Sequence, residues 1–154
     1  MSSTLKIYGK LDNNVQNLKG FLEKAKRGEH LTLEVKSPGG TLGAMHEMTE
    51  YVENARKEKG CVFSIEVVDA RSAALLLVLY FNEDERVINE KSKGMIHLPI
   101  GTSPESKIRE ATVNFISNKT KLSPVQVLYY EDKIMSGPEL IKHGFAKEII
   151  TESV

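Results

Sequence analysis

The chain has 154 residues, about the size of one domain, with 21 Lys and Arg residues balanced by 21 Asp and Glu residues. A net charge of zero argues against a nucleic-acid partner, because phosphate binding requires a concentrated excess of basic side chains. The single cysteine, Cys61, excludes an internal disulfide and favours a reducing compartment.

No targeting or membrane signal is visible in the sequence. The N-terminus lacks the charged and apolar segments of a signal peptide. The longest strongly apolar stretch, residues 73–81, is far shorter than the roughly 20 residues that cross a bilayer. We therefore expect a soluble, cytoplasmic protein without a membrane partner.

Hydrophobic patterns predict strands that alternate with helices. A first helix is expected between Asp12 or Asn13, which can cap it, and Gly28, which ends it. The expected strands cover residues 5–9, 30–36, 61–68, 87–89, 94–97 and 145–150. The other expected helices cover residues 42–55, 73–80, 103–119, 123–130 and 136–143, and the second of these is apolar on all sides and should be buried. This alternation predicts a single α/β domain, residues 1–154, with parallel strand pairing.

The segment Ser37-Pro38-Gly39-Gly40 lies between an expected strand and an expected helix. Adjacent glycines allow positive φ angles, and N–H groups at a helix N-terminus can bind an oxyanion or a phosphate. The alternative is an ordinary strand-to-helix turn.

Ser72 lies at a second junction of a strand with a helix, where the helix N-terminus stabilises negative charge. This is the position of a nucleophile elbow, although the G-x-S-x-G pattern is absent. The alternative is a serine that only caps the helix.

His97 and Asp132 are candidate partners for Ser72. An imidazole can accept the hydroxyl proton at neutral pH, and a carboxylate can hold the imidazole in the required tautomer. The alternatives are a hydrogen-bonded strand histidine and a solvated acid. One cysteine and four scattered histidines give no closely spaced ligand set, so neither a metal nor a cofactor is expected.

Taken together, these segments resemble the Clp protease proteolytic subunit family, a branch of the crotonase-like fold. The resemblance runs from Leu5 to about Ile150 and includes the 25-residue separation of the serine from the histidine. The similar segments are residues 7–9, 37–40, 70–77, 94–99, 132–139 and 143–145.

The resemblance implies a serine peptidase with a layered sheet and helices, in which Ser72 is the nucleophile, His97 the base and Asp132 the orienting acid. The implied oxyanion donors are the backbone N–H groups of Gly40 and Ala73. It also implies a peptide or protein substrate and a homo-oligomer, which the zero net charge permits.

Three departures from the family pattern have consequences. The first strand begins almost at once, which argues against the family's unfoldase ATPase as a partner. The handle segment, residues 103–119, is short by roughly three to four helical turns, which argues against a double ring. Arg71 replaces a small residue before the nucleophile, where it could lower the pKa of His97, pair with Asp69 or point to solvent.

Three functions fit these observations. The first is an energy-independent serine endopeptidase, and the second is a catalytically inactive relative that serves as an assembly or peptide-binding module. The third is a crotonase-like enzyme acting on acyl thioesters, which shares the oxyanion architecture and needs no triad. The motifs favour the peptidase.

Overall fold

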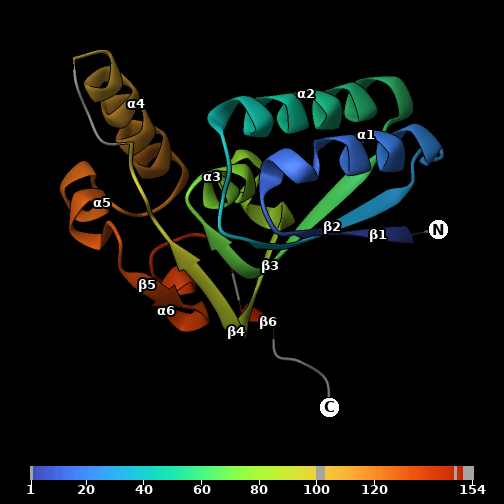
Figure 1. Cartoon of the computed structure of the whole chain (residues 1–154). Helices are drawn as coiled ribbons and strands as arrows, with labels where there is room; N and C mark the ends of the chain where they lie inside the picture. The colour runs from blue at the N-terminus through green and yellow to red at the C-terminus, as the bar shows by residue number, and fades with distance from the viewer. Residues whose placement is uncertain (1, 100–102, 148, 151–154) are drawn as a thin grey trace.

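The computed structural model describes residues 2–99, 103–147 and 149–150 (Figure 1). Its strands are β1 (Ser2–Tyr8), β2 (His30–Ser37), β3 (Val62–Arg71), β4 (Arg86–Met95), β5 (Ile134–Ser136) and β6 (Ile149–Ile150). Its helices are α1 (Val15–Lys24), α2 (Leu42–Lys59), α3 (Ala73–Tyr80), α4 (Ser103–Lys119), α5 (Pro124–Tyr130) and α6 (Gly137–Lys142), with short 3-10 helices η1 (Leu11–Asn13) and η2 (Glu83–Glu85).

The strands form one sheet in the order β1-β2-β3-β4-β5, with β6 paired to β4. Strands β1 to β4 are parallel, as predicted, and β5 is antiparallel to β4. Because the parallel strands are in register, Ser37 lies opposite Ala70, and Arg71 lies opposite Met95. The ends of β2, β3 and β4 therefore meet at one edge of the sheet, where the candidate site residues follow.

Helices α1 and α2 cover one face of β1 to β3 (Figure 1). Strand residues on that face are apolar and buried, since alternate side chains of a strand point to the same side. They include Ile7, Leu31, Leu33, Val35, Phe63, Ile65 and Val67. Cys61 is buried beside them and is a free thiol.

Helix α3 is buried along most of its length, as its uniformly apolar sequence predicts. All residues from Ala73 to Leu79 are at most 7% exposed. Among the described residues, no helix has both the length and the apolar character needed to cross a membrane.

Five details differ from the sequence-based expectations. Helix α1 begins after Asn14, and it ends at Lys24 rather than at Gly28. Strand β3 extends to Arg71, and β5 was not expected. The final strand covers Ile149–Ile150 within the described residues rather than the whole of 145–150.

The two short strands expected over 87–89 and 94–97 belong to one strand, β4, which ends at Met95, before His97. Its pairing with β3 shifts between Val67 and Asp69, which lie opposite Ile88 and Lys93. Ser92 lies within this irregularity, and its hydroxyl group donates a hydrogen bond to the Val67 carbonyl oxygen, 2.5 Å from Ser92 Oγ. The Ser92 side chain thus takes the place of a backbone donor to Val67 in the polar middle of β4. The hydrophobic pattern alone predicts a break between two strands at this stretch.

Arg86 is a buried cation that ties together the ends of two helices. It is 6% exposed and donates hydrogen bonds to the carbonyls of Leu79, Phe81, Lys119 and Phe145 at 3.0–3.3 Å. Burial lowers the pKa of Arg86 from its ordinary value. Carbonyls at the C-terminal ends of helices carry partial negative charge, which compensates the buried guanidinium.

Candidate active site

Ser72 follows the last residue of β3 and lies close to the end of β4. Its backbone N–H donates to the Met95 carbonyl at 3.1 Å, which continues the pairing of the two strands by one residue. His97 comes two residues after Met95 on the same strand end. Strand register therefore brings the candidate nucleophile and the candidate base to neighbouring positions at one edge of the sheet.

The backbone of Ser72 has the sharp turn of a nucleophile elbow. Its φ is 56° and its ψ is −128°, values that cost a non-glycine residue on the order of 1–3 kcal/mol. Ser72 occupies the N-cap position of α3, but its side chain makes no capping hydrogen bond. The helix-capping alternative for the hydroxyl is therefore wrong, and the strain must be maintained by neighbouring packing.

Gly39 provides part of that packing. Its φ is +116°, and a Cβ added there would lie 2.9 Å from Ser72 Cβ and 3.3 Å from Ala73 N. Such a separation is too short for two carbon atoms. Only glycine at residue 39 allows the loop to approach Ser72 this closely.

His97 and Asp132 contact each other directly. His97 Nδ1 lies 2.8 Å from Asp132 Oδ1, while the two side chains are 48% and 61% exposed. Asp132 has a left-handed φ of 62°, and its N–H donates to the Ile96 carbonyl at 2.7 Å. With Nδ1 bound to the carboxylate, Nε2 is the imidazole nitrogen left to exchange a proton with another group. The described residues include no hydrogen bond between Ser72 and His97.

The amides of the segment Ser37 to Thr41 differ in whether they are already hydrogen-bonded. The Gly39 N–H donates to Ser37 Oγ at 3.1 Å, and the Thr41 N–H donates to Asp12 Oδ1 at 3.0 Å. The Gly40 N–H has no acceptor among the described residues. This amide is free to bind an external oxygen atom.

The direction of the Gly40 amide follows from the peptide bond that precedes it. The Gly39 carbonyl accepts a hydrogen bond from Leu11 N at 2.9 Å. No peptide bond among the described residues is cis, and in a trans peptide the N–H points opposite to the C=O. The Gly40 N–H therefore points away from Leu11. The Ala73 N–H, at the start of α3, likewise has no acceptor among the described residues.

Asp12 has a role that differs from the one expected. It was predicted as a possible cap of α1, but its carboxylate accepts hydrogen bonds from the Thr41 N–H and from Thr41 Oγ1 at 2.8 Å. These bonds lower the pKa of Asp12 from its ordinary value. Asp12 thus fixes the loop that carries Gly40, a contact between distant residues that no local sequence signal indicates.

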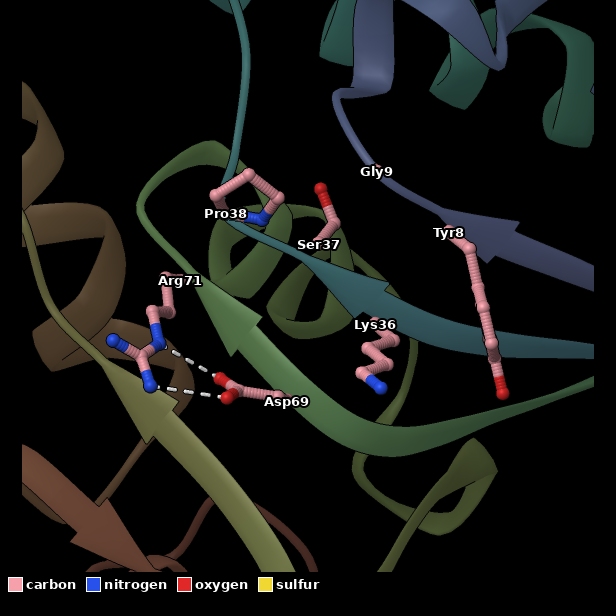
Figure 2. Close-up of a pocket in the computed structure, with 7 residues that line it drawn as sticks. All are labelled: Tyr8, Gly9, Lys36, Ser37, Pro38, Asp69 and Arg71. Atoms are coloured by element: carbon pink, nitrogen blue, oxygen red, sulfur yellow. Dashed lines mark hydrogen bonds and ion pairs between the residues drawn. The ribbon is translucent and has the colours of Figure 1, made fainter.

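Arg71 pairs with Asp69, which was one of the alternatives for this residue. Its Nε and Nη2 donate to the two carboxylate oxygens at 2.9 and 3.0 Å, and this pairing raises the pKa of Arg71 (Figure 2). The pair lines a cavity of about 410 Å³ together with Tyr8, Lys36 and residues of the Ser37-Pro38 turn. The guanidinium charge is therefore compensated by a carboxylate on its own strand.

A second cavity, of about 460 Å³, opens between α2, α3 and α4. Its lining is mainly apolar and includes Leu42 in the first turn of α2, Leu76 in the first turn of α3, and Phe115 of α4. The first turn of α2 begins two residues after the free Gly40 amide, and the first turn of α3 begins with the free Ala73 amide. An apolar side chain of a bound molecule fits such a lining.

Metal chemistry finds no support in the side chains. Within residues 2–99, 103–147 and 149–150, no group of three or more His, Cys, Asp or Glu side chains is arranged to hold a metal ion. The arrangement of Ser72, His97, Asp132 and two free amides instead suits acyl transfer.

Comparisons with known proteins agree with this chemistry. A structure described as the ClpP1 N165D mutant from Listeria monocytogenes is similar to this chain with a TM-score of 0.75, over 97% of this chain and 91% of that chain, at 20% sequence identity. This similarity confirms the predicted α/β fold. The sequence also matches the family model described as Clp protease over residues 3–153. The chain therefore belongs to the Clp protease family and is a serine-type peptidase.

Proposed function

We propose that this protein is a serine endopeptidase that hydrolyses peptide bonds with Ser72 as nucleophile, His97 as general base and Asp132 as the orienting acid. The contact between His97 Nδ1 and Asp132 Oδ1 at 2.8 Å, beside a serine with an elbow backbone, is the observation that carries this proposal. Without that contact, the imidazole would lack a group to hold its tautomer.

In the proposed reaction, Ser72 Oγ attacks the scissile carbonyl carbon while His97 Nε2 accepts the hydroxyl proton. The N–H groups of Gly40 and Ala73 donate hydrogen bonds to the negative oxygen that forms, a contribution typically worth a few kcal/mol for each donor. The C–N bond then breaks as His97 returns the proton to the leaving amine. Water, activated by the same imidazole, hydrolyses the acyl-enzyme and releases Ser72.

The apolar cavity between α2, α3 and α4 supports a preference for substrates with an apolar side chain next to the cleaved bond. Its lining includes the first turns of α2 and α3, and the proposed oxyanion donors are Gly40, two residues before α2, and Ala73, the first residue of α3. Burial of an apolar side chain contributes roughly 25 cal/mol for each Å² removed from water. We expect peptides with Leu or Met at this position to have a lower KM than those with Ala.

A fluorophosphonate probe tests the assignment of the nucleophile. We expect it to label wild-type protein covalently and to leave Ser72→Ala unlabelled. Ser64→Ala is the matched control, because Ser64 Oγ lies 2.7 Å from His30 Nε2 but has no elbow backbone. Labelling that survives in Ser72→Ala, or moves to another serine, would contradict the proposal.

The second candidate is a catalytically inactive assembly or peptide-binding module. It is favoured by the lack of a hydrogen bond between Ser72 and His97 within the described chain, although such bonds are often long in unliganded enzymes. No labelling of the wild-type protein in any oligomeric state, combined with retained peptide binding, would support this candidate.

We also propose that the protein self-associates in the cytoplasm. Helix α5 exposes Val125, Leu128 and Tyr129, at 75%, 47% and 63%, which is an unusual apolar surface for a helix of seven residues. Light scattering should give a mass above that of one 17.2 kDa chain. A monomeric mass across all concentrations would contradict the oligomer.

A further inference from the structure

Arg109 of α4 and Glu131 at the end of α5 form a two-pronged ion pair beside the candidate site. Arg109 Nη1 donates to Glu131 Oε2 at 2.9 Å, and Nη2 donates to Oε1 at 2.7 Å. The side chains are 31% and 20% exposed. Two parallel charge-assisted bonds fix the relative orientation of both planar groups, which a single contact would not do.

This pair holds the chain on the C-terminal side of His97. The Glu131 carboxylate also accepts a hydrogen bond from the Leu98 N–H, and Arg109 Nη1 donates to the Pro99 carbonyl at 3.2 Å. Both residues of the pair therefore bind the backbone within two residues of His97. The hydrogen bonds from Arg109 also lower the pKa of Glu131.

On the N-terminal side of His97, residues 131–132 bind the backbone of Ile96. Glu131 forms an isolated parallel bridge with Ile96, and the Asp132 N–H donates to the Ile96 carbonyl at 2.7 Å. Residues 131 and 132 thus bind the backbone on both sides of His97, at Ile96 before it and at Leu98 after it. The orientation of this dipeptide fixes both partners of the contact between His97 and Asp132.

Backbone anchors matter here because packing around the two side chains is slight. The side chains of His97 and Asp132 are 48% and 61% exposed. An exposed ion pair contributes too little to hold two side chains in one geometry against their rotamer freedom. Their alignment must therefore come from the segments that carry them.

The positive charge of Arg109 also offsets the repulsion between two neighbouring carboxylates. Glu131 and Asp132 are adjacent carboxylates, and the negative charge of Asp132 disfavours ionisation of Glu131. The Arg109 guanidinium compensates this repulsion, since its hydrogen bonds with Glu131 neutralise the nearer carboxylate. Without it, Asp132 would lie next to an unpaired negative charge.

We propose that Arg109 and Glu131 are positioning residues that align His97 with Asp132, so that helix α4 controls the geometry of the proposed acid–base dyad. This inference rests on the proposed triad. Neither residue touches the reacting atoms, so each acts through the backbone of residues 96–99 and 131–132.

Two mild substitutions test this role. Arg109→Lys keeps the positive charge but cannot form the two parallel hydrogen bonds of the planar guanidinium. Glu131→Gln keeps the shape of the side chain and loses its negative charge. We expect each to lower kcat about 10- to 100-fold with KM changed less than twofold, because small misplacement of a proposed base costs that much in rate. We also expect each to broaden or remove the NMR signal of the His97 Nδ1 proton, assigned in ¹⁵N-histidine-labelled protein with His97→Gln.

Arg56→Lys is the matched control. Arg56 forms an equally short two-pronged pair with Glu85, at 2.8 and 2.9 Å, with side chains 25% and 12% exposed, and it joins α2 to η2. This variant should lower Tm but leave kcat and the His97 signal unchanged. If Arg109→Lys and Glu131→Gln lower only Tm, as the control does, the positioning role is wrong.

The NMR readout separates this inference from the proposed function. If the fluorophosphonate does not label wild-type Ser72 but the His97 signal disappears in Arg109→Lys, the peptidase proposal fails and the positioning role remains. If Ser72 is labelled while the His97 signal and kcat of both variants match the wild type, the positioning role fails and the peptidase proposal remains.

Discussion

His97 and Asp132 are 35 residues apart in the sequence, and their side chains lie 2.8 Å apart at the edge of the sheet. Strand β4 delivers the histidine, and the left-handed backbone of Asp132 turns the carboxylate toward it after α5. This contact and its surroundings lead to five predictions.

Asp132→Asn tests the orienting role of the carboxylate. The amide group can present its NH₂ to Nδ1, which favours the tautomer with the proton on Nε2 and prevents this nitrogen from accepting the serine proton. We expect kcat to fall by about 10²- to 10⁴-fold with little change in KM. Asp84→Asn, at an exposed acid in η2, is the control and should leave steady-state kinetics unchanged.

The pH dependence of activity tests the base. A protonated imidazole cannot accept the hydroxyl proton. The kcat/KM for a peptide substrate should therefore fall on acidification, as the imidazole becomes protonated. A profile that stays flat down to pH 5 would exclude histidine as the base.

Gly39→Ala tests the close approach of the loop to Ser72, the proposed nucleophile. The added methyl group would lie 2.9 Å from Ser72 Cβ, at a φ of +116° that alanine rarely adopts. We expect the rate of fluorophosphonate labelling to fall by about 100-fold or more. Gly20→Ala is the control, because nothing lies within 4 Å of the new methyl group inside α1. It should preserve labelling and raise stability by up to about 1 kcal/mol.

The difference in stability between the wild type and Glu131→Gln should depend on pH in a defined direction. The pKa of Glu131 is lowered in the folded protein, chiefly by its hydrogen bonds from Arg109. The stabilisation is therefore complete above the ordinary glutamate pKa of about 4.3 and is lost as the pH falls through the lower folded value. Urea unfolding should show a wild-type advantage at pH 7 that shrinks below pH 4. An advantage that grows on acidification would contradict this linkage.

Arg86→Lys should destabilise the fold without altering the site directly. A lysine cannot satisfy all four carbonyls that Arg86 binds, and unsatisfied buried groups cost about 1–3 kcal/mol each. We expect the free energy of unfolding to drop by on the order of 2–3 kcal/mol. Arg27→Lys, at an exposed position after α1, is the control and should change it by less than about 0.5 kcal/mol. Equal stability of both variants would contradict the buried role.

Much of the fold follows from local sequence patterns. The uniformly apolar run 73–80 predicts a buried helix, and the start of α5 at Ser123-Pro124 forms the capping contact that its residue types favour. Such features depend on neighbours a few residues apart, so periodicity and capping preferences suffice. The irregular β4 was predicted as two short strands because a side chain of Ser92, rather than the backbone pattern, bridges it to Val67.

The sequence by itself determined the alternation of strands and helices over the first hundred residues, the family resemblance and the candidate residues Ser72, His97 and Asp132. Only the tertiary structure decided that Asp132 meets His97 rather than solvent, that Arg71 pairs with Asp69, and that Asp12 holds the Gly40 loop instead of capping α1. The Arg109–Glu131 ion pair is likewise a contact that only the tertiary structure decided. The physical reason is that these contacts join residues whose side-chain directions depend on strand register and backbone angles, which residue type and spacing do not specify.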